Sequence, residues 1–367
     1  MNRKRQWLKA AAWVLAVVAV LVAAAIFAGL QLAQQKMQRK VDVHVRPVAS
    51  LTDAQALARG KYLYASRGCV DCHGANGAGR TFVDDGSLRI AGPNITTGPG
   101  GVVAAYRPVD WVRTIRHGVS PQGRALMVMP SEDYNRFTDD DLAALVAYIT
   151  ALPPVAGQGA VVDLPLPVRA LYGFGLIKDA AAKIDHSLPP PQPVAEGVTV
   201  AHGAYVANMC IGCHGARLAG GKIPGGPPDW PAAANLTPGT GSVMALYPDA
   251  DSMIRMFRTG KRSDGTTVKV MPFESLREMN ETDLRALHLY QRDVDYIVRD
   301  GEDRRHAAKT AWRHAAGPQA APVPRSKARA PSAGPVSSGL RRTGPTPPML
   351  PTRPSDTPCT TRSLLLA

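Results

Sequence analysis

The chain has 367 residues, 45% of them hydrophobic, which is enough for two or three domains with apolar cores. Its formal net charge of +14 suggests nucleic-acid binding, but four of the basic side chains lie in residues 1–9 and eleven in residues 301–367. Residues 10–300 are therefore nearly neutral, which excludes the clustered basic face that nucleic-acid binding needs.

The first predicted element is a membrane anchor. Residues 10–30 contain no charged or strongly polar side chain over 21 positions, about the length that crosses a bilayer as a helix. Trp7 and Trp13 lie near its start, where aromatic rings favour the membrane interface. The positive-inside rule predicts a cytoplasmic basic segment over residues 1–9, a transmembrane anchor over residues 10–33, and export of the rest of the chain. A cleaved signal peptide is the alternative, although its apolar region is usually shorter.

A C-x-x-C-H motif follows at residues 69–73. The thiols of Cys69 and Cys72 can bond covalently to a haem, and His73 then ligates the iron from below. We expect a helix capped by Thr52 to lead into this motif. The glycine-rich segment after the motif predicts turns rather than a regular element.

A second axial ligand is expected downstream of this motif. Met127, Met129 and His117 are the candidates. We favour Met129 because Pro130 follows it and stiffens the loop that carries the thioether.

Flanking helices complete a predicted haem domain over residues 50–152. Gly60 in the first helix leaves room for the close approach of another helix. Thr138 and Asp141 form a capping pair ahead of an apolar stripe with helical spacing. Pro153 then ends that last helix.

Residues 198–299 repeat this order and form a second predicted haem domain. The second motif supplies the same ligands, Cys210, Cys213 and His214. In both copies the first cysteine precedes an Asn-x-Thr segment by 25 positions. Met271 occupies the position of Met129, whereas Met127 corresponds to Lys269, so Met129 and Met271 are the predicted axial ligands. His117 corresponds to a threonine and Met279 to a phenylalanine, so neither is expected to bind iron.

Other uses of the two motifs are a redox dithiol, a structural disulfide and half of a zinc site. A redox dithiol does not need histidine at the next position, and zinc needs further Cys or His ligands nearby. The motifs use four of the five cysteines, so no disulfide framework remains. Because these alternatives do not explain two identical motifs, we expect two covalently bound haem c groups.

The remaining segments join and follow these domains. Residues 153–197 form a connector, and its apolar stretch at residues 166–184 predicts a helix packed between the haem domains. In the second domain Gln291 falls where Ile149 supplies core, which predicts a damaged last helix and suggests an altered or misread ending. Residues 300–367 contain eleven prolines and predict a disordered tail.

The chain resembles the cytochrome c subunits of membrane-bound bacterial alcohol, aldehyde and gluconate dehydrogenases. Both haem motifs, the two Asn-x-Thr segments and the Met-Pro and capped-helix segments carry this resemblance over residues 50–290. It implies a mainly α fold, with two tandem cytochrome c-like domains behind a transmembrane helix. It also implies electrons that arrive from a dehydrogenase subunit and leave toward quinone or a terminal oxidase. Many such subunits carry three haem motifs, whereas this chain has two.

The ligand set predicts an electron carrier rather than an enzyme. His/Met ligation fills both axial positions and leaves no open site for a substrate, so we expect no catalytic residues. One alternative is a dihaem enzyme in which an open iron acts on a peroxide or a sulfur oxyanion. Another is the haem subunit of a terminal oxidase.

Overall fold

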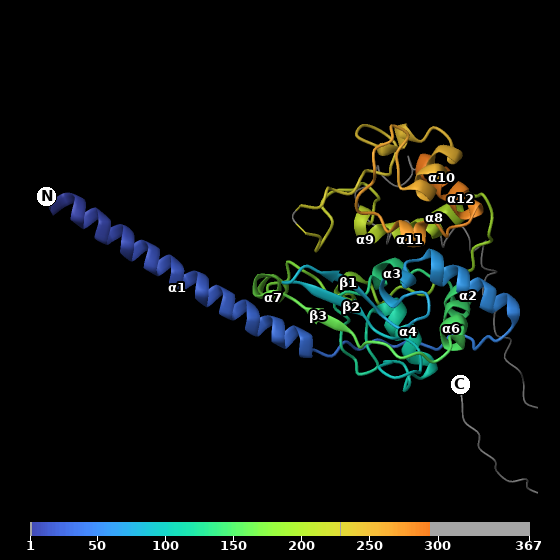
Figure 1. Cartoon of the computed structure of the whole chain (residues 1–367), viewed down its shortest axis with the longest axis horizontal. Coiled ribbons are helices and arrows are strands. Elements are labelled where there is room, and N and C mark those ends of the chain that lie inside the picture. The colour runs from blue at the N-terminus through green and yellow to red at the C-terminus, as the bar shows by residue number, and fades with distance from the viewer. Residues whose placement is uncertain (1, 228, 294–367) are drawn as a thin grey trace, which may run out of the picture. The chain divides into compact units, whose positions relative to one another are not determined.

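A computed structural model describes residues 2–227 and 229–293 (Figure 1). The described part of the chain is mainly helical, as predicted, with one small sheet. It lies within a single compact unit, Met1–Ala315. The predicted disordered tail and the last residues of the predicted second haem domain lie outside the described residues.

Helix α1, Asn2–Gln38, extends beyond both ends of the predicted anchor. Its segment Arg5–Gln38 is long and apolar enough, by length and composition, to cross a membrane. The rest of the described chain buries none of the most apolar window of this segment. Helix α1 is therefore compatible with the expected membrane anchor.

Five helices form the first region, residues 50–152: α2 (Ala54–Ser66), α3 (Cys69–His73), α4 (Pro108–His117), α5 (Ser131–Tyr134) and α6 (Asp139–Ala151). Asp53, not Thr52, caps α2, because the helix begins one residue later than expected and the Asp53 carboxylate accepts a hydrogen bond from the Ala56 N–H at 2.9 Å. Thr138 caps α6 as predicted, and its hydroxyl accepts a hydrogen bond from the Asp141 N–H at 3.1 Å.

Helices α2 and α6 pack against each other at Gly60 (Figure 1). A Cβ atom at this position would lie 2.0 Å from the carbonyl oxygen of Ala144, so only glycine permits the contact. This confirms the predicted close approach. Three leucines fill the core beside it: Leu63, Leu142 and Leu145.

A small antiparallel sheet follows the glycine-rich segment over residues 74–79, which forms turns as predicted. Its strands are β1 (Arg80–Asp84), β2 (Arg89–Gly92) and β3 (Val161–Asp163), in the order β1-β2-β3. Asp85 closes the hairpin, because its carboxylate accepts hydrogen bonds from the N–H groups of Ser87 and Leu88. The sheet itself was not predicted, and its third strand, β3, comes from the distant connector.

The second region, residues 198–293, repeats the helical order of the first. Its elements are α8 (Val200–Val206), η2 (Ala207–Cys210), α9 (Ile211–His214), η3 (Val243–Leu246), α10 (Ala250–Thr259), α11 (Phe273–Leu276) and α12 (Glu281–Arg292). Helices α8 and α12 meet at Gly203, where a Cβ atom would lie 2.0 Å from the carbonyl oxygen of Ala286. This contact is equivalent to the one at Gly60. Each region has its own buried apolar cluster.

The last helix of the second region is intact, so the expectation of a damaged helix was wrong. Asn280 caps α12 by accepting a hydrogen bond from the Asp283 N–H at 2.7 Å. Gln291 is buried within the helix. The helix persists because its other apolar positions keep the core contacts, namely Leu284, Leu287 and Tyr290.

The connector contains helix α7, Leu166–Gly173, and the short helix η1, Ala181–Lys183. Helix α7 packs against α1, not between the two helical regions as predicted. The backbones meet so closely that a Cβ atom at Gly173 would lie 1.9 Å from the carbonyl oxygen of Gly29. Gly29 and Gly173 therefore allow the backbones of α1 and α7 to pack closely together.

We predict that Gly60→Ala destabilises the protein by about 1–3 kcal/mol, because the new methyl group overlaps the α6 backbone. A thermal melt followed by circular dichroism measures the loss. Gly159→Ala is the control, since a Cβ atom there meets nothing within 4 Å. Equal melting temperatures for the two variants would contradict the packing described here.

Candidate haem sites

The first haem motif forms the helical turn α3. Within it the Nδ1–H of His73 donates a hydrogen bond to the carbonyl oxygen of Pro93 at 2.9 Å. Burial lowers the pKa of this imidazole, and the carbonyl bond raises it less. The neutral ring therefore keeps the lone pair of Nε2 for a metal, which is the form in which histidine ligates iron.

The second motif holds its histidine in the same way. The Nδ1–H of His214 donates to the carbonyl oxygen of Ala234 at 2.8 Å, and burial again lowers the pKa of the ring. In both copies the accepting carbonyl lies 20 positions after the histidine. The two predicted ligands thus have matching orientation and protonation.

The thiols of the first motif lack the lowered pKa of a redox dithiol. Cys69, Cys72 and Cys210 are half-buried and Cys213 is exposed. Burial raises the pKa of the Cys69 thiol to about 12 and that of Cys72 to about 11, whereas a redox dithiol needs a lowered pKa. Among the described residues no group of three or more His, Cys, Asp or Glu side chains is arranged to hold a metal ion.

The two predicted methionine ligands each share an apolar core with their motif. Met129 is half-buried and packs against the first cluster, as Cys69 does. Met271 packs against the second cluster, as Cys210 does. The thiols, the neutral imidazole and the thioether in each region therefore fit a covalently bound haem with His/Met ligation.

Two candidates that the repeat had excluded have other contacts. The Nδ1 atoms of His117 and His186 lie 3.0 Å apart, so His117 is engaged with the connector. Met279 is fully buried in the second apolar cluster, as its match to a phenylalanine predicted.

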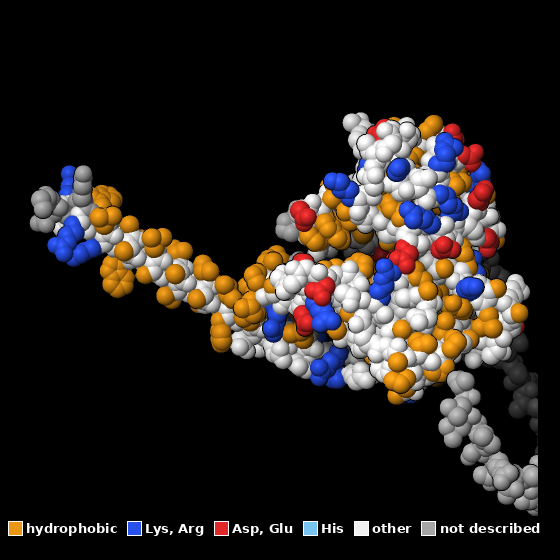
Figure 2. Space-filling view, in the orientation of Figure 1, with side chains coloured by type: hydrophobic (Ala, Val, Ile, Leu, Met, Phe, Trp, Pro, Cys, Tyr) orange, Lys and Arg blue, Asp and Glu red, His pale blue; other side chains and the backbone are white. Residues whose placement is uncertain are grey.

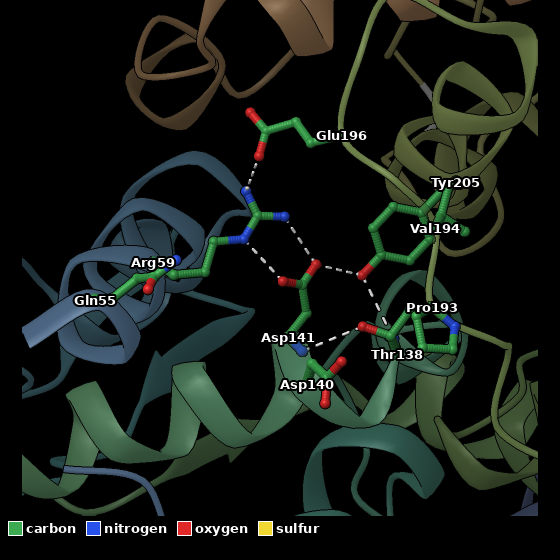
Figure 3. A pocket seen from close by; sticks show the side chains of 9 residues that line it. All are labelled: Gln55, Arg59, Thr138, Asp140, Asp141, Pro193, Val194, Glu196 and Tyr205. Carbon is green, nitrogen blue, oxygen red and sulfur yellow. Dashed lines mark hydrogen bonds and ion pairs between the residues drawn. The ribbon is translucent and has the colours of Figure 1, made fainter. Parts of the chain in front are cut away.

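Sequence reasoning did not find the contacts that join the two regions. The hydroxyl of Tyr205 donates to Asp141 Oδ2 at 2.6 Å, as Figure 3 shows. In return the hydroxyl of Tyr62 donates to Asp283 Oδ2 at 2.5 Å. The two tyrosines occupy equivalent positions of the repeat, two residues after Gly60 and Gly203, and so do the two aspartates. The interface is therefore reciprocal, and the repeated Gly-x-Tyr spacing was the signal that could have revealed it.

Each haem motif also contacts the other region. Asp133 Oδ1 accepts a hydrogen bond from the Gly212 N–H, inside the second motif, at 2.8 Å. The hydroxyl of Ser275 donates to Asp71, inside the first motif. Asp133 and Ser275 again occupy equivalent positions, in the short helices α5 and α11 that follow the predicted methionine ligands. Each motif thus touches the segment that carries the other region's candidate axial ligand.

The Asp283 side of this interface is the more deeply buried. Arg67 and His202 both bond to the Asp283 carboxylate, at 2.5 Å and 2.7 Å, and their side chains are almost fully buried. Burial on its own raises the pKa of Asp283, but hydrogen bonds from its neighbours and the charge of Arg67 bring it well below its usual value.

The Asp141 side is more open to solvent. There Arg59 makes the corresponding bonds to the carboxylate, from Nε at 2.8 Å and from a terminal nitrogen at 2.9 Å. Arg59 also reaches Glu196 of the connector, so its guanidinium joins the carboxylates of Asp141 and Glu196 in the pocket that Figure 3 shows.

Comparison with known proteins finds similarity to cytochrome c subunits. Residues 55–149 match the family model described as cytochrome c oxidase, cbb3-type, subunit III. The chain is 27% identical to the fructose dehydrogenase cytochrome subunit of Gluconobacter japonicus, over 70% of this chain and 56% of that protein. It is 31% identical to the gluconate 2-dehydrogenase cytochrome c subunit of Pantoea cypripedii, over 46% and 41%. For the alcohol dehydrogenase (quinone) cytochrome c subunit of Gluconobacter oxydans the identity is 27%, over 47% and 37%.

These similarities confirm the predicted resemblance to cytochrome c subunits of dehydrogenases. Residues 55–149 match a cytochrome c family model, and a cytochrome c domain implies covalently bound haem c. The matches cover between 37% and 56% of the length of the three relatives.

We predict that the buried carboxylate makes the protein sensitive to acid. The folded pKa of Asp283 lies below its unfolded value of about 3.9, so its stabilisation is complete above that pH and is lost as pH falls toward the folded pKa. Asp283→Asn should cost about 3–5 kcal/mol at pH 7, because Arg67 loses its buried partner.

Urea unfolding at pH 7 and pH 3.5 measures both effects. Asp283→Asn should lose less stability between the two pH values than the unchanged protein does. The exposed Asp140→Asn is the control and should follow the unchanged protein. If Asp283→Asn lost as much stability between pH 7 and pH 3.5 as the unchanged protein does, the role given to this carboxylate would be contradicted.

Proposed function

We propose that this chain is a membrane-anchored dihaem electron carrier that serves a dehydrogenase subunit. The observation that carries this proposal is the matched setting of two motif histidines, His73 and His214, each fixed through Nδ1 with Nε2 free for iron. A haem held at each site supplies an iron that gains and loses one electron. The chain contributes the thiols, the axial ligands and a fixed position for each site.

The proposed axial pairs are His73 with Met129 and His214 with Met271. A thioether opposite the imidazole occupies the position that a substrate would need, and it raises the reduction potential. This is the reason for proposing an electron carrier rather than an enzyme with an open iron.

We propose that residues 198–293 are a second cytochrome c domain in tandem with the first. The repeated order of helices, the equivalent glycine contacts and the separate apolar cluster support this assignment. The reciprocal bonds of Tyr62 and Tyr205 then hold the two haem motifs in a fixed relation, so that an electron can pass from one site to the other inside one chain.

The proposed donor is a dehydrogenase subunit, since the names of the similar proteins describe cytochrome subunits of fructose, gluconate and alcohol dehydrogenases. The proposed acceptor is quinone or a terminal oxidase. With α1 as the anchor and the basic residues of its start in the cytoplasm, the haem domains lie in the periplasm.

A second candidate function is that of a haem subunit in a terminal oxidase. The description of the family model that matches residues 55–149 favours it. Purification of the chain from membranes with its native partners separates the two functions, because a dehydrogenase subunit supports the first and an oxidase core supports the second.

We predict that Met271→Ala and Met129→Ala keep their haem covalently bound but expose its iron, because only the axial thioether is lost. Each variant should bind about one carbon monoxide per chain in the reduced state, and its reduction potential should fall. Met127→Ala is the control, since the repeat has lysine at that position. If either variant keeps a low-spin spectrum, binds no carbon monoxide and has an unchanged reduction potential, that methionine is not the axial ligand.

The haem count is the second prediction for this function. The purified chain should contain two covalent haems by the pyridine haemochrome assay, and a variant with Cys210→Ala and Cys213→Ala should contain one. The control Cys359→Ser should keep both, because this cysteine lies outside the two motifs. A single haem in the unchanged protein would refute the dihaem proposal.

A further inference from the structure

We propose that the connector helix α7 and the turn after it lie in the outer boundary of the bilayer beside α1 and form a second lipid contact. The occupant of this surface is the lipid of the membrane that α1 crosses. The inference rests on the proposed anchor, and it adds a site of membrane contact within the connector between the two haem domains.

The first observation is the close contact between α7 and the apolar segment of α1. A Cβ atom at Gly29 would lie 2.8 Å from the Phe174 ring and 2.9 Å from the Ala170 side chain. Ala33, one turn further along α1, is fully buried. Helix α7 therefore covers one face of α1 over its last apolar turns.

The second observation is the depth at which this contact occurs. The apolar run of α1 covers residues 10–30, and a helix rises about 1.5 Å per residue, so Gly29 lies about 28 Å along the helix from the start of the run. The hydrocarbon core of a bilayer is about 30 Å thick. Residues of α7 that touch Gly29 are therefore at the outer edge of that core once α1 spans it.

The third observation is the exposure of large apolar side chains on α7 and the turn after it. They are Leu166 at 56%, Leu171 at 41%, Phe174 at 49% and Leu176 at 73% exposed. In Figure 2 the hydrophobic surface of α1 continues onto the part of the molecule where Figure 1 places α7. A contiguous apolar surface of this kind marks an interaction site.

Polar contacts hold α7 in place on the side away from the hydrocarbon. The ammonium group of Lys36 donates to the carbonyl oxygen of Tyr172 at 2.9 Å. Arg39 makes two bonds to the Asp179 carboxylate, at 2.6 Å and 2.7 Å, and the Tyr172 hydroxyl donates to the same carboxylate. Lys36 lies about 10 Å beyond Gly29 along the helix, which is the depth of the lipid headgroups. Charged groups thus lie in the headgroup layer and apolar groups at the hydrocarbon edge, the pattern of an interfacial helix.

Continuity with the anchor distinguishes lipid from a protein partner. A dehydrogenase subunit docked on this face would have to displace lipid that already surrounds α1 at the same depth. The lipid contact, in contrast, needs no component beyond the membrane that α1 already requires. We therefore assign the surface to the bilayer.

Site-specific labelling of the full-length, haem-loaded protein in phosphatidylcholine nanodiscs tests this assignment. Single cysteines are introduced by Leu171→Cys and, separately, by Phe174→Cys in a Cys359→Ser background, where the motif thiols are blocked by haem. The matched control is Leu246→Cys, because Leu246 in the second region is 41% exposed, as Leu171 is. The measurement is the rate of reaction with a charged, membrane-impermeant maleimide.

We expect both test positions to react at least about tenfold more slowly than position 246, because a charged reagent is excluded from the hydrocarbon edge. Equal rates at all three positions, in a protein that still sediments with phosphatidylcholine vesicles after carbonate washing, would overturn the lipid contact and leave this surface for a protein partner. Loss of sedimentation would instead overturn the proposed anchor, and the inference would fail with it.

Discussion

A carboxylate that leaves water costs several kcal/mol unless its charge and its lone pairs are satisfied. Asp283 meets that requirement only because the first region supplies Arg67 and Tyr62 while its own region supplies His202. The second region therefore cannot bury this carboxylate properly without the first. Since the bonds are short and the groups almost fully buried, a small separation of the regions would leave an unpaired charge in an apolar surrounding. This constraint keeps the two candidate haem sites in one relative arrangement.

The reciprocal geometry follows from the repeat itself. When two copies of one fold pack about an approximate two-fold relation, each contact from one copy has a counterpart from the other. Tyr62 and Tyr205 are such a pair, and the glycines before them let each helix approach its partner closely enough to direct the tyrosine outward. The copies have diverged where symmetry is not required. Arg59 bonds to Asp141 near solvent, whereas at the equivalent position His202 bonds to the buried Asp283.

Local patterns predicted the haem motifs, the Thr138 cap, the close approach at Gly60 and the mainly helical class, because each depends on residues near one another in sequence or on a repeated spacing. Strand β3 was missed because it pairs with β2 across some seventy positions. Helix α7 was predicted, but its partner was wrong, since an apolar stretch does not specify which apolar surface covers it. The bonds between the regions involve ordinary Tyr, Asp and Arg residues whose role appears only when the fold brings them together.

The chain after helix α1 contacts the first region more directly than the second. After α1 the Val41 N–H donates to the carbonyl oxygen of Gly123 at 2.8 Å, and Val43 packs with Val119 in a small buried cluster. These contacts are on the loop that leads to Met129. Among the described residues, the second region is held through its interface with the first and through the connector. Helix α1 therefore joins the first candidate haem region directly, and the buried Asp283 network links that region to the second.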